Sequence, residues 1–237
     1  MIIVKGLKKK YGNNQILSGV DFAAYAGDFI VLLGTSGSGK STVFRCMTLR
    51  ESWDEGELIY NGANVDKSSW KEKLKLRKEW AYLEEKPNLN KNRTALKNVI
   101  SGRFLMTSIW KLLGVEEKFD ALDMLDKVGL QNKAHLVLDK LSGGEKQRVA
   151  IAKALVQGAK VLVMDEPITG LEPESATRVL DDLKNLCETQ NITVICTLNQ
   201  INLAEKYANR ILGLSDGKIV VNVSGRRLTQ REKDLIN

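Results

Sequence analysis

The sequence has little histidine, cysteine or proline: one histidine, three cysteines and three prolines among 237 residues. The cysteines, Cys46, Cys187 and Cys196, are odd in number and lack the spacing of a metal site. This scarcity argues against a disulfide framework and favours a reducing compartment such as the cytosol. Each cysteine falls within an apolar helix or strand pattern, so we expect buried thiols without a chemical role.

Long hydrophobic runs are also missing. No apolar stretch approaches the roughly 20 residues that a membrane span needs. Residues 1–5, Met-Ile-Ile-Val-Lys, are too short and too soon charged for a signal peptide, and we interpret them as part of a first strand. The chain is 43% hydrophobic and 27% charged, as in ordinary globular proteins, and its length favours one domain with an inserted subdomain.

The charge is unbalanced toward the basic side, with 36 lysines and arginines against 29 acidic residues and a net charge of +7. The basic residues are spread along the chain and form no stripe. Attraction to an anionic membrane surface or to nucleotide phosphates therefore explains the charge better than nucleic-acid binding, and we expect no nucleic-acid partner. We interpret Lys8-Lys9-Lys10 and Arg226-Arg227 as solvated faces.

A glycine-rich loop follows the apolar run at residues 29–33. It fits the pattern G-x-x-x-x-G-K-[ST] between a buried strand and a helix, where backbone N–H groups and the positive helix end form a cradle for phosphate. A Gly/Ser turn with a chance lysine is the alternative, and the strand and helix context argues against it. We expect Lys40 to reach the β- and γ-phosphates and Ser41 to ligate Mg²⁺. The predicted loop comprises Gly34, Thr35, Ser36, Gly37, Ser38, Gly39, Lys40, Ser41 and Thr42.

Strand and helix patterns change along the chain. Residues 2–33 alternate short apolar runs with turns, which indicates an antiparallel sheet leading into the loop. Between about residues 87 and 158, apolar residues recur at helical spacing. Beyond that, strand-length apolar runs alternate with helical patterns, which favours a parallel sheet wrapped by helices. The expected strands are 161–164, 192–196 and 211–214, and the expected helices are 173–190 and 201–209.

Local signals add three details. Asn61-Gly62 is typical of a hairpin turn. Asp216-Gly217 predicts a last hairpin that returns through residues 218–223. Thr229 and Glu232 match a capping box, so we expect a short helix near the end of the sequence.

Two further motifs occur downstream of the phosphate loop. Residues 141–148 read Leu-Ser-Gly-Gly-Glu-Lys-Gln-Arg, and residues 161–167 read Val-Leu-Val-Met-Asp-Glu-Pro. With these motifs the chain resembles the ATP-binding subunit of an ABC transporter, over about residues 2–223. The resemblance implies an α/β P-loop NTPase fold: an ABC-type ATPase with a RecA-like core, an antiparallel β flank and an inserted helical subdomain. The core would comprise 1–86 and 158–237, and the helical subdomain 87–157.

The resemblance also assigns roles to single residues. Tyr11 stands where the family places an aromatic that stacks on adenine, although an exposed turn tyrosine would read the same. Asp165 ends the apolar strand and would accept a hydrogen bond from Mg²⁺-bound water or from Ser41, which holds the metal in place. Glu166 matches the general base that polarises the attacking water. The alternative for this pair is a solvated acidic turn.

The segment Ser142-Gly143-Gly144-Glu145 opens a predicted helix. Ser142 is a good N-cap. The paired glycines are not required for capping, and we expect their bare N–H groups to suit a γ-phosphate. In the family, this segment completes the ATP site of a partner subunit in a head-to-tail dimer, which ATP closes and hydrolysis reopens.

Three positions depart from the family pattern. Glu85 aligns with a glutamine and adds negative charge near the expected Mg²⁺, so it is a candidate catalytic and metal-binding residue. Asn199 replaces a histidine, since the chain's one histidine is His135, in an ordinary loop position. Glu172 replaces an aspartate. An asparagine can hydrogen-bond a γ-phosphate but has no cationic form, so we expect normal ATP binding with slow hydrolysis.

Within the family, the chain resembles the ATPases of phosphonate importers at residues 98–103, 107–111, 155–160 and 173–176. That resemblance implies a second copy of the chain and transmembrane permease subunits as partners, with the permease received by residues 84–112. It also implies an indirect substrate-binding protein and a peripheral place on the cytoplasmic face of the inner membrane. Two alternatives remain: a nucleotide-switched module with weak or no hydrolysis, and a soluble ABC ATPase without a transport role.

Overall fold

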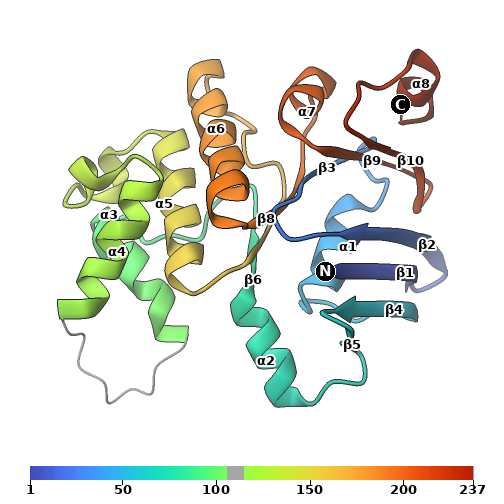
Figure 1. Cartoon of the computed structure of the whole chain (residues 1–237), viewed down its shortest axis with the longest axis horizontal. Helices are drawn as coiled ribbons and strands as arrows, with labels where there is room; N and C mark the ends of the chain where they lie inside the picture. The colour runs from blue at the N-terminus through green and yellow to red at the C-terminus, as the bar shows by residue number, and fades with distance from the viewer. Residues whose placement is uncertain (106–114, 237) are drawn as a thin grey trace.

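Two β-sheets and the helices around them make up the structure (Figure 1). This computed structural model describes residues 1–105 and 115–236. In chain order the strands are β1 (Ile2–Tyr11), β2 (Asn14–Ala24), β3 (Phe29–Leu33), β4 (Glu55–Tyr60), β5 (Ala63–Asn64), β6 (Trp80–Leu83), β7 (Val161–Met164), β8 (Thr193–Thr197), β9 (Arg210–Ser215) and β10 (Lys218–Ser224). One sheet has the strand order β2-β1-β4-β5, and the other has the order β10-β9-β3-β8-β7-β6.

The smaller sheet is antiparallel, as expected for the start of the chain. Asn61 and Gly62 form the turn between β4 and β5, which confirms the hairpin prediction. The interpretation of the lysine run as a solvated face is wrong for Lys9. Its side chain is only 10% exposed, and its Nζ lies 3.6 Å from Oε1 of Glu51. Successive strand residues point to opposite faces, so β1 turns Lys9 inward while its neighbours face solvent.

The larger sheet is parallel from β9 to β6, and β10 returns antiparallel beside β9. Both the parallel sheet and the final hairpin are therefore confirmed. β3, β7 and β8 are buried along their whole length. Parallel strands covered on both faces favour such continuous apolar runs, so this pattern explains why the central strands lack polar alternation.

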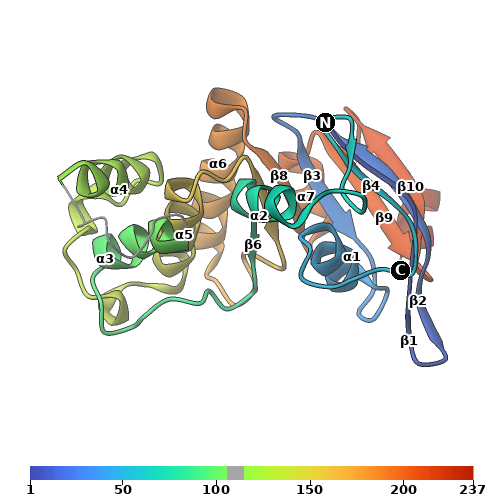
Figure 2. The same ribbon diagram turned by 90° about the horizontal axis from the view of Figure 1, so that it is seen from below.

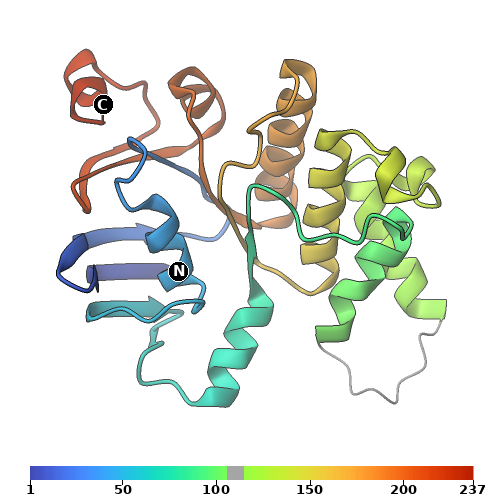
Figure 3. The ribbon, with the colours of Figure 1, turned by 180° about the vertical axis from the view of Figure 1, so that it is seen from behind.

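Alternation along β3 divides the interior into two hydrophobic cores. Phe29, Val31 and Leu33 belong to the core that contains the helices of the helical region. Ile30 and Leu32 belong to the core shared with the antiparallel sheet and with α1 (Lys40–Met47). The helix α1 thus packs between the two sheets (Figures 1 and 3).

The helical region lies at the opposite end of the structure from the antiparallel sheet (Figure 2). Its helices α3, α4 and α5 confirm the helical pattern predicted between residues 87 and 158, as far as that segment is described. A fold with an antiparallel β flank and a helical region is therefore confirmed, whereas the domain boundaries stay a prediction. The helices beyond α1 are α2 (Trp70–Glu79), α3 (Ala95–Ile100), α4 (Val115–Lys127), α5 (Gly143–Val156), α6 (Pro173–Gln190), α7 (Ile201–Tyr207) and α8 (Gln230–Ile236), with 3-10 turns η1 (Ser101–Leu105), η2 (Gln131–Lys133) and η3 (Leu138–Lys140).

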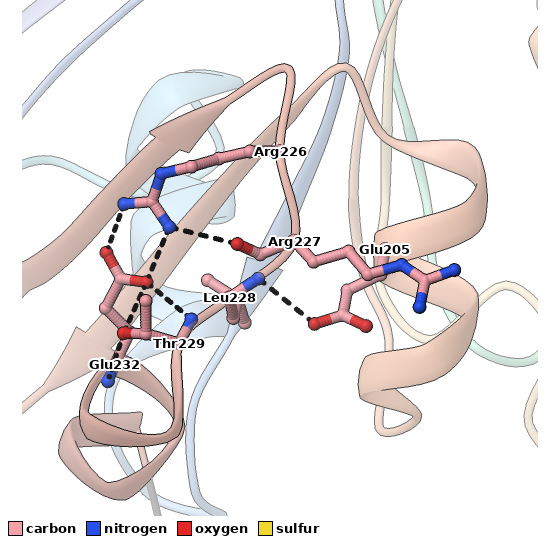
Figure 4. A network of polar contacts seen from close by, with 6 residues as sticks. All are labelled: Glu205, Arg226, Arg227, Leu228, Thr229 and Glu232. Atoms are coloured by element: carbon pink, nitrogen blue, oxygen red, sulfur yellow. Dashed lines mark hydrogen bonds and ion pairs between the residues drawn. The ribbon is translucent and has the colours of Figure 1, made fainter.

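The C-terminal helix α8 is fastened to the rest of the fold by a polar network (Figure 4). Arg226 donates two hydrogen bonds to Glu232, at 2.9 and 2.6 Å. Glu232 also accepts from the backbone N–H of Thr229, whose hydroxyl accepts from the Glu232 N–H, so the predicted capping box is confirmed. Arg226 and Thr229 together lower the pKa of Glu232 to about 2. The Leu228 N–H, just before α8, donates to Glu205 of α7 at 3.1 Å, and Nζ of Lys233 in α8 lies 3.1 Å from the same carboxylate.

The cysteines are buried free thiols, as expected. Burial raises the pKa of Cys46 and of Cys187 to about 12, so both are poor nucleophiles at neutral pH. His135 is exposed, which suits an ordinary loop residue. None of the helices within residues 1–105 and 115–236 combines the length and the apolar character that crossing a bilayer would need.

Candidate nucleotide site

The glycine-rich loop connects β3 to α1, as the sequence predicts. Gly39 is the N-cap of α1 and has a φ of 104°, a left-handed value that favours glycine. A Cβ there would lie 2.8 Å from Cδ2 of Leu17, so the close approach of β2 also requires glycine. Lys40 donates hydrogen bonds from Nζ to the carbonyls of Gly34 and Thr35, at 2.8 Å each. The loop is therefore wrapped around its own lysine.

A cavity of about 650 Å³ opens at this loop and gathers four segments of the chain. Tyr11 comes from the end of β1, the loop and α1 supply the floor, and the segments after β7 and β8 supply the remaining side chains. This lies at the carboxyl ends of parallel strands, where open α/β sheets bind ligands. Its lining residues are Tyr11, Ile16, Ser36, Gly37, Gly39, Lys40, Ser41, Thr42, Asp165, Glu166 and Asn199.

Lys40 is the one cationic side chain among the described residues that line this cavity. Burial lowers its pKa, and the carboxylates of Glu166 and Asp165 offset part of that effect. A buried ammonium facing two carboxylates is suited to an anionic ligand that replaces its contacts with the loop carbonyls. In the same loop, the Ser38 hydroxyl is buried and makes no hydrogen bond with the described residues.

Asp165 directly follows β7 and is held from both neighbouring strands. Its Oδ1 accepts a hydrogen bond from Oγ1 of Thr197 in β8, at 2.9 Å. Its Oδ2 lies 3.4 Å from the hydroxyl of Tyr82 in β6. Burial raises the pKa of Tyr82, and the charge of Asp165 raises it further, so the phenol stays protonated and donates. The sequence analysis identified neither Tyr82 nor Thr197. The available signal was that each is a polar residue near the end of an apolar strand.

Glu166 has a backbone conformation that is rare outside glycine, with a φ of 48°. Its N–H donates to Oγ1 of Thr197 at 2.7 Å, and its Oε2 accepts from Oγ1 of Thr169 at 2.7 Å. Asp165 and Glu166 therefore accept hydrogen bonds from different side chains, and the Thr197 hydroxyl connects them. Such local strain persists where surrounding contacts hold it, and it is common at functional sites.

Tyr11 lies at the rim of the cavity with 44% of its surface exposed. Nζ of Lys9 lies 5.4 Å from the centre of its ring. Burial raises the pKa of Tyr11, and the nearby Glu51 carboxylate adds to this, so the ring is neutral. An exposed neutral ring at the edge of a phosphate loop suits stacking against a base.

The segment from Ser142 to Glu145 begins α5 with a complete capping box, in which Ser142 and Glu145 exchange hydrogen bonds. Close packing requires both glycines, and the role of their open N–H groups toward a phosphate stays a prediction. A Cβ on Gly143 would lie 2.9 Å from Leu171, and one on Gly144 would lie 2.9 Å from Ser175. Burial would raise the pKa of Glu145, but Lys133 and the Ser142 N–H outweigh it and leave the pKa below its usual value.

Three sets of predicted site residues are not among the described residues that line the cavity. The first set belongs to the loop itself: Gly34, Thr35 and Ser38. Residues 142–145 are not among the described residues that line it, so within one chain they do not meet Lys40. Glu85 is exposed and is also outside the described lining. Asn199 does line it, beside Glu166 and Lys40.

A second cavity of about 670 Å³, here called the β6 groove, runs between β6, the residues after α1 and the helix α5. Among its described lining residues, three side chains are cationic, Arg50, Arg77 and Lys153, and one is a carboxylate, Glu84. Tyr82 also lines it. The groove is therefore positively charged and borders the same strand that reaches Asp165.

Comparisons with known proteins show which family this chain matches. Residues 17–169 match the family described as ABC transporter. The chain is 37% identical over 221 residues to the hypophosphite import ATP-binding protein HtxD of Stutzerimonas stutzeri, covering 92% of this chain and 65% of that protein. The chain thus spans less than two thirds of the length of HtxD. It is also 37% identical over 239 residues to the phosphonates import ATP-binding protein PhnC of Lactococcus lactis subsp. lactis (strain IL1403), covering 99% and 97%.

Solved structures share the fold over nearly the whole chain. The dimeric, ADP- and Pi-bound ATP-binding cassette MJ0796 superposes with a TM-score of 0.81 at 29% identity, covering 96% of this chain and 100% of that one. CbiO1 of Clostridium perfringens, part of the transporter complex cbiONQ, gives 0.85 at 25% identity, covering 94% and 88%. From these matches and from its phosphate loop and paired carboxylates, the chain belongs to the ABC transporter family, as an ATP-binding ATPase subunit.

Proposed function

We propose that this chain energises the import of a phosphonate or a related oxyanion through a membrane permease. The observation that carries the proposal is the cavity that joins Lys40, Ser41, Asp165 and Glu166, the residues that the sequence assigned to nucleotide and metal. The cargo class is supported by the names of two relatives, which import phosphonates and hypophosphite. We further propose a nucleotide-binding core of residues 1–86 and 158–237 with a helical subdomain of 87–157.

Mg²⁺ fits this site because the Ser41 hydroxyl and the Asp165 carboxylate are both hard oxygen donors that line the cavity. Bound there, the ion would neutralise charge on the β- and γ-phosphates. Lys40 would move from the loop carbonyls to the same phosphates, the loop N–H groups would hold them, and Tyr11 would stack on adenine. Glu85, which is exposed in this structure, stays a prediction as a further metal ligand.

Glu166 is the candidate general base, since its carboxylate is separate from the contacts that hold Asp165. Asn199, on the same cavity, would hydrogen-bond the γ-phosphate. The Ser142-Gly143-Gly144-Glu145 segment would complete the site from a second copy of the chain, in a head-to-tail dimer. This segment is not among the described residues that line the cavity in one chain, and the MJ0796 cassette is dimeric; both observations support this arrangement.

The β6 groove is the proposed contact for a transmembrane permease, because it lies beside residues 84–112, the segment that the resemblance assigns to that partner. Part of that segment, residues 106–112, lies outside the described residues. Docking there would hold the chain peripherally on the cytoplasmic face of the inner membrane, with a substrate-binding protein acting through the permease. The membership of CbiO1 in a transporter complex supports such a partnership.

Purification of the chain from cells, together with the proteins bound to it, tests the proposal. The tagged chain, purified from detergent-solubilised membranes, should retain an integral membrane protein, and deletion of its gene should abolish uptake of a labelled phosphonate. Recovery of the chain without any membrane protein would favour a non-transport ATPase. Asn199 also supports a second candidate, a nucleotide-switched module with weak hydrolysis. A phosphate-release assay separates the two, since that module binds ATP and releases little phosphate.

A further inference from the structure

Tyr82 lines the β6 groove and contacts a carboxylate of the nucleotide cavity. It sits in β6, paired with Val163 of β7, and its ring lines the β6 groove. Its hydroxyl points across the strand end to Oδ2 of Asp165, which lines the nucleotide cavity. One side chain therefore connects the proposed permease contact with the proposed metal carboxylate.

The two contacts that hold Asp165 are unequal. The Thr197 hydroxyl donates at 2.9 Å, and the backbone N–H of Glu166 fixes that hydroxyl in turn at 2.7 Å. The Tyr82 hydroxyl lies at 3.4 Å, which is long against the usual 2.5–3.0 Å for an O–H···O bond. The contact from β8 is therefore fixed by backbone, and the contact from β6 is the adjustable one.

The groove side of the tyrosine ring is covered by an exposed charged pair. The Arg50 guanidinium lies 4.9 Å from the ring centre, within cation–π range. Arg50 also lies 3.7 Å from Glu84, and both side chains are more than half exposed. A protein segment that enters the groove would meet this pair before it meets the ring. Its charges would compete for Arg50 and so change one of the contacts on Tyr82; the other is the Arg45 side chain, which interacts with the hydroxyl.

We infer that Tyr82 is a positioning residue: it orients Asp165 for Mg²⁺, and through Arg50 it makes that orientation depend on what occupies the β6 groove. The inference rests on the proposed function, because it treats Asp165 as a metal ligand and the groove as a partner contact. The coupling is reciprocal, so Mg-nucleotide in the cavity favours one position of Arg50 in the groove.

Tyr82→Phe tests the first half, because it removes the hydroxyl and keeps the ring. Isothermal titration with ATP should show Mg-ATP affinity reduced roughly three- to tenfold, as for one lost hydrogen bond of ordinary strength, because the contact at 3.4 Å is long. In a metal chelator, ATP affinity should stay within about twofold of wild type. Tyr60→Phe is the matched control, since Tyr60 also donates to a carboxylate, Oε2 of Glu79 at 2.9 Å, away from the cavity. It should leave both affinities unchanged.

Arg50→Gln and the double variant test the second half. Arg50→Gln should weaken Mg-ATP in the same direction as Tyr82→Phe, and the double variant should bind like Tyr82→Phe alone, because Arg50 acts through the hydroxyl. Fully additive losses would show that Arg50 acts independently and would overturn this half.

Other outcomes overturn the whole inference. If Tyr82→Phe loses the same ATP affinity with and without Mg²⁺, the variant has a structural defect and Tyr82 has no role toward the metal. If Tyr82→Phe binds Mg-ATP as tightly as wild type does, the positioning role of Tyr82 is rejected and the proposed function still stands. Failure of wild type to bind Mg-ATP would instead reject the proposed function.

Discussion

Thr197→Val removes one hydroxyl that performs two tasks and leaves the size of the side chain almost unchanged. Thr197 has no exposed surface. Its Oγ1 donates to Asp165 at 2.9 Å and accepts from the Glu166 N–H at 2.7 Å. The variant therefore loses two hydrogen bonds and strands an N–H in a residue whose φ is 48°.

The expected cost follows from these contacts. A hydrogen bond contributes about 1 kcal/mol net, and a stranded buried donor costs about 1–3 kcal/mol. We expect Thr197→Val to lose about 2–4 kcal/mol of unfolding free energy. In a domain of this size that lowers Tm by roughly 4–16 °C. The freed Asp165 and Glu166 should also weaken Mg-ATP binding and slow hydrolysis.

Calorimetric melting and Mg-ATP titration measure both effects, with Thr193→Val as the matched control. Thr193 lies on the same strand, is also buried, and its hydroxyl makes one hydrogen bond, to the Tyr25 carbonyl at 3.0 Å. The control should lose about 1 kcal/mol and keep its nucleotide affinity. Thr197→Ser should recover most of the loss. A Thr197→Val protein that melts with wild type, or a control that impairs Mg-ATP equally, would refute this reasoning.

Four further predictions follow from the site and the chain end. Lys40→Ala should abolish tight Mg-ATP binding in calorimetry, and unchanged affinity would reduce the loop to a turn. Glu166→Gln should bind ATP and accumulate as a dimer in size-exclusion chromatography, and a monomer at saturating ATP, where wild type dimerises, would contradict the shared site. Asn199→His should raise kcat about tenfold or more, somewhat less than the ~10²–10³-fold typical of a whole transition-state donor, and Glu85→Gln should add to it in steady-state phosphate release. Glu232 has a folded-state pKa lowered to about 2. Its stabilising effect is therefore present above its unfolded pKa of about 4.3 and is lost as pH falls through about 2. The difference in Tm between wild type and Glu232→Gln should disappear as pH falls through that window.

Sequence alone determined the parts of this protein that are encoded locally. The phosphate loop was recognisable because its glycines, lysine and hydroxyls are consecutive and stand between a strand and a helix. The N-cap at Ser142, the capping box at Thr229 and the turn at Asn61-Gly62 were predictable for the same reason, since each depends on residues at most three apart. Apolar periodicity separated the helical region from the parallel strands because burial imposes a period on each kind of element.

Tertiary structure decided how segments distant in the chain meet. Tyr82 and Thr197 reach Asp165 because β6 and β8 flank β7, and strand order is not written in any one strand. Lys9 is turned inward by the register of β1, although its composition suggested a solvated run. The glycines Gly143 and Gly144 are fixed by contacts with residues about thirty positions later. These features depend on which elements pack together. A pattern within one segment does not show which distant segment will lie beside it in the folded chain.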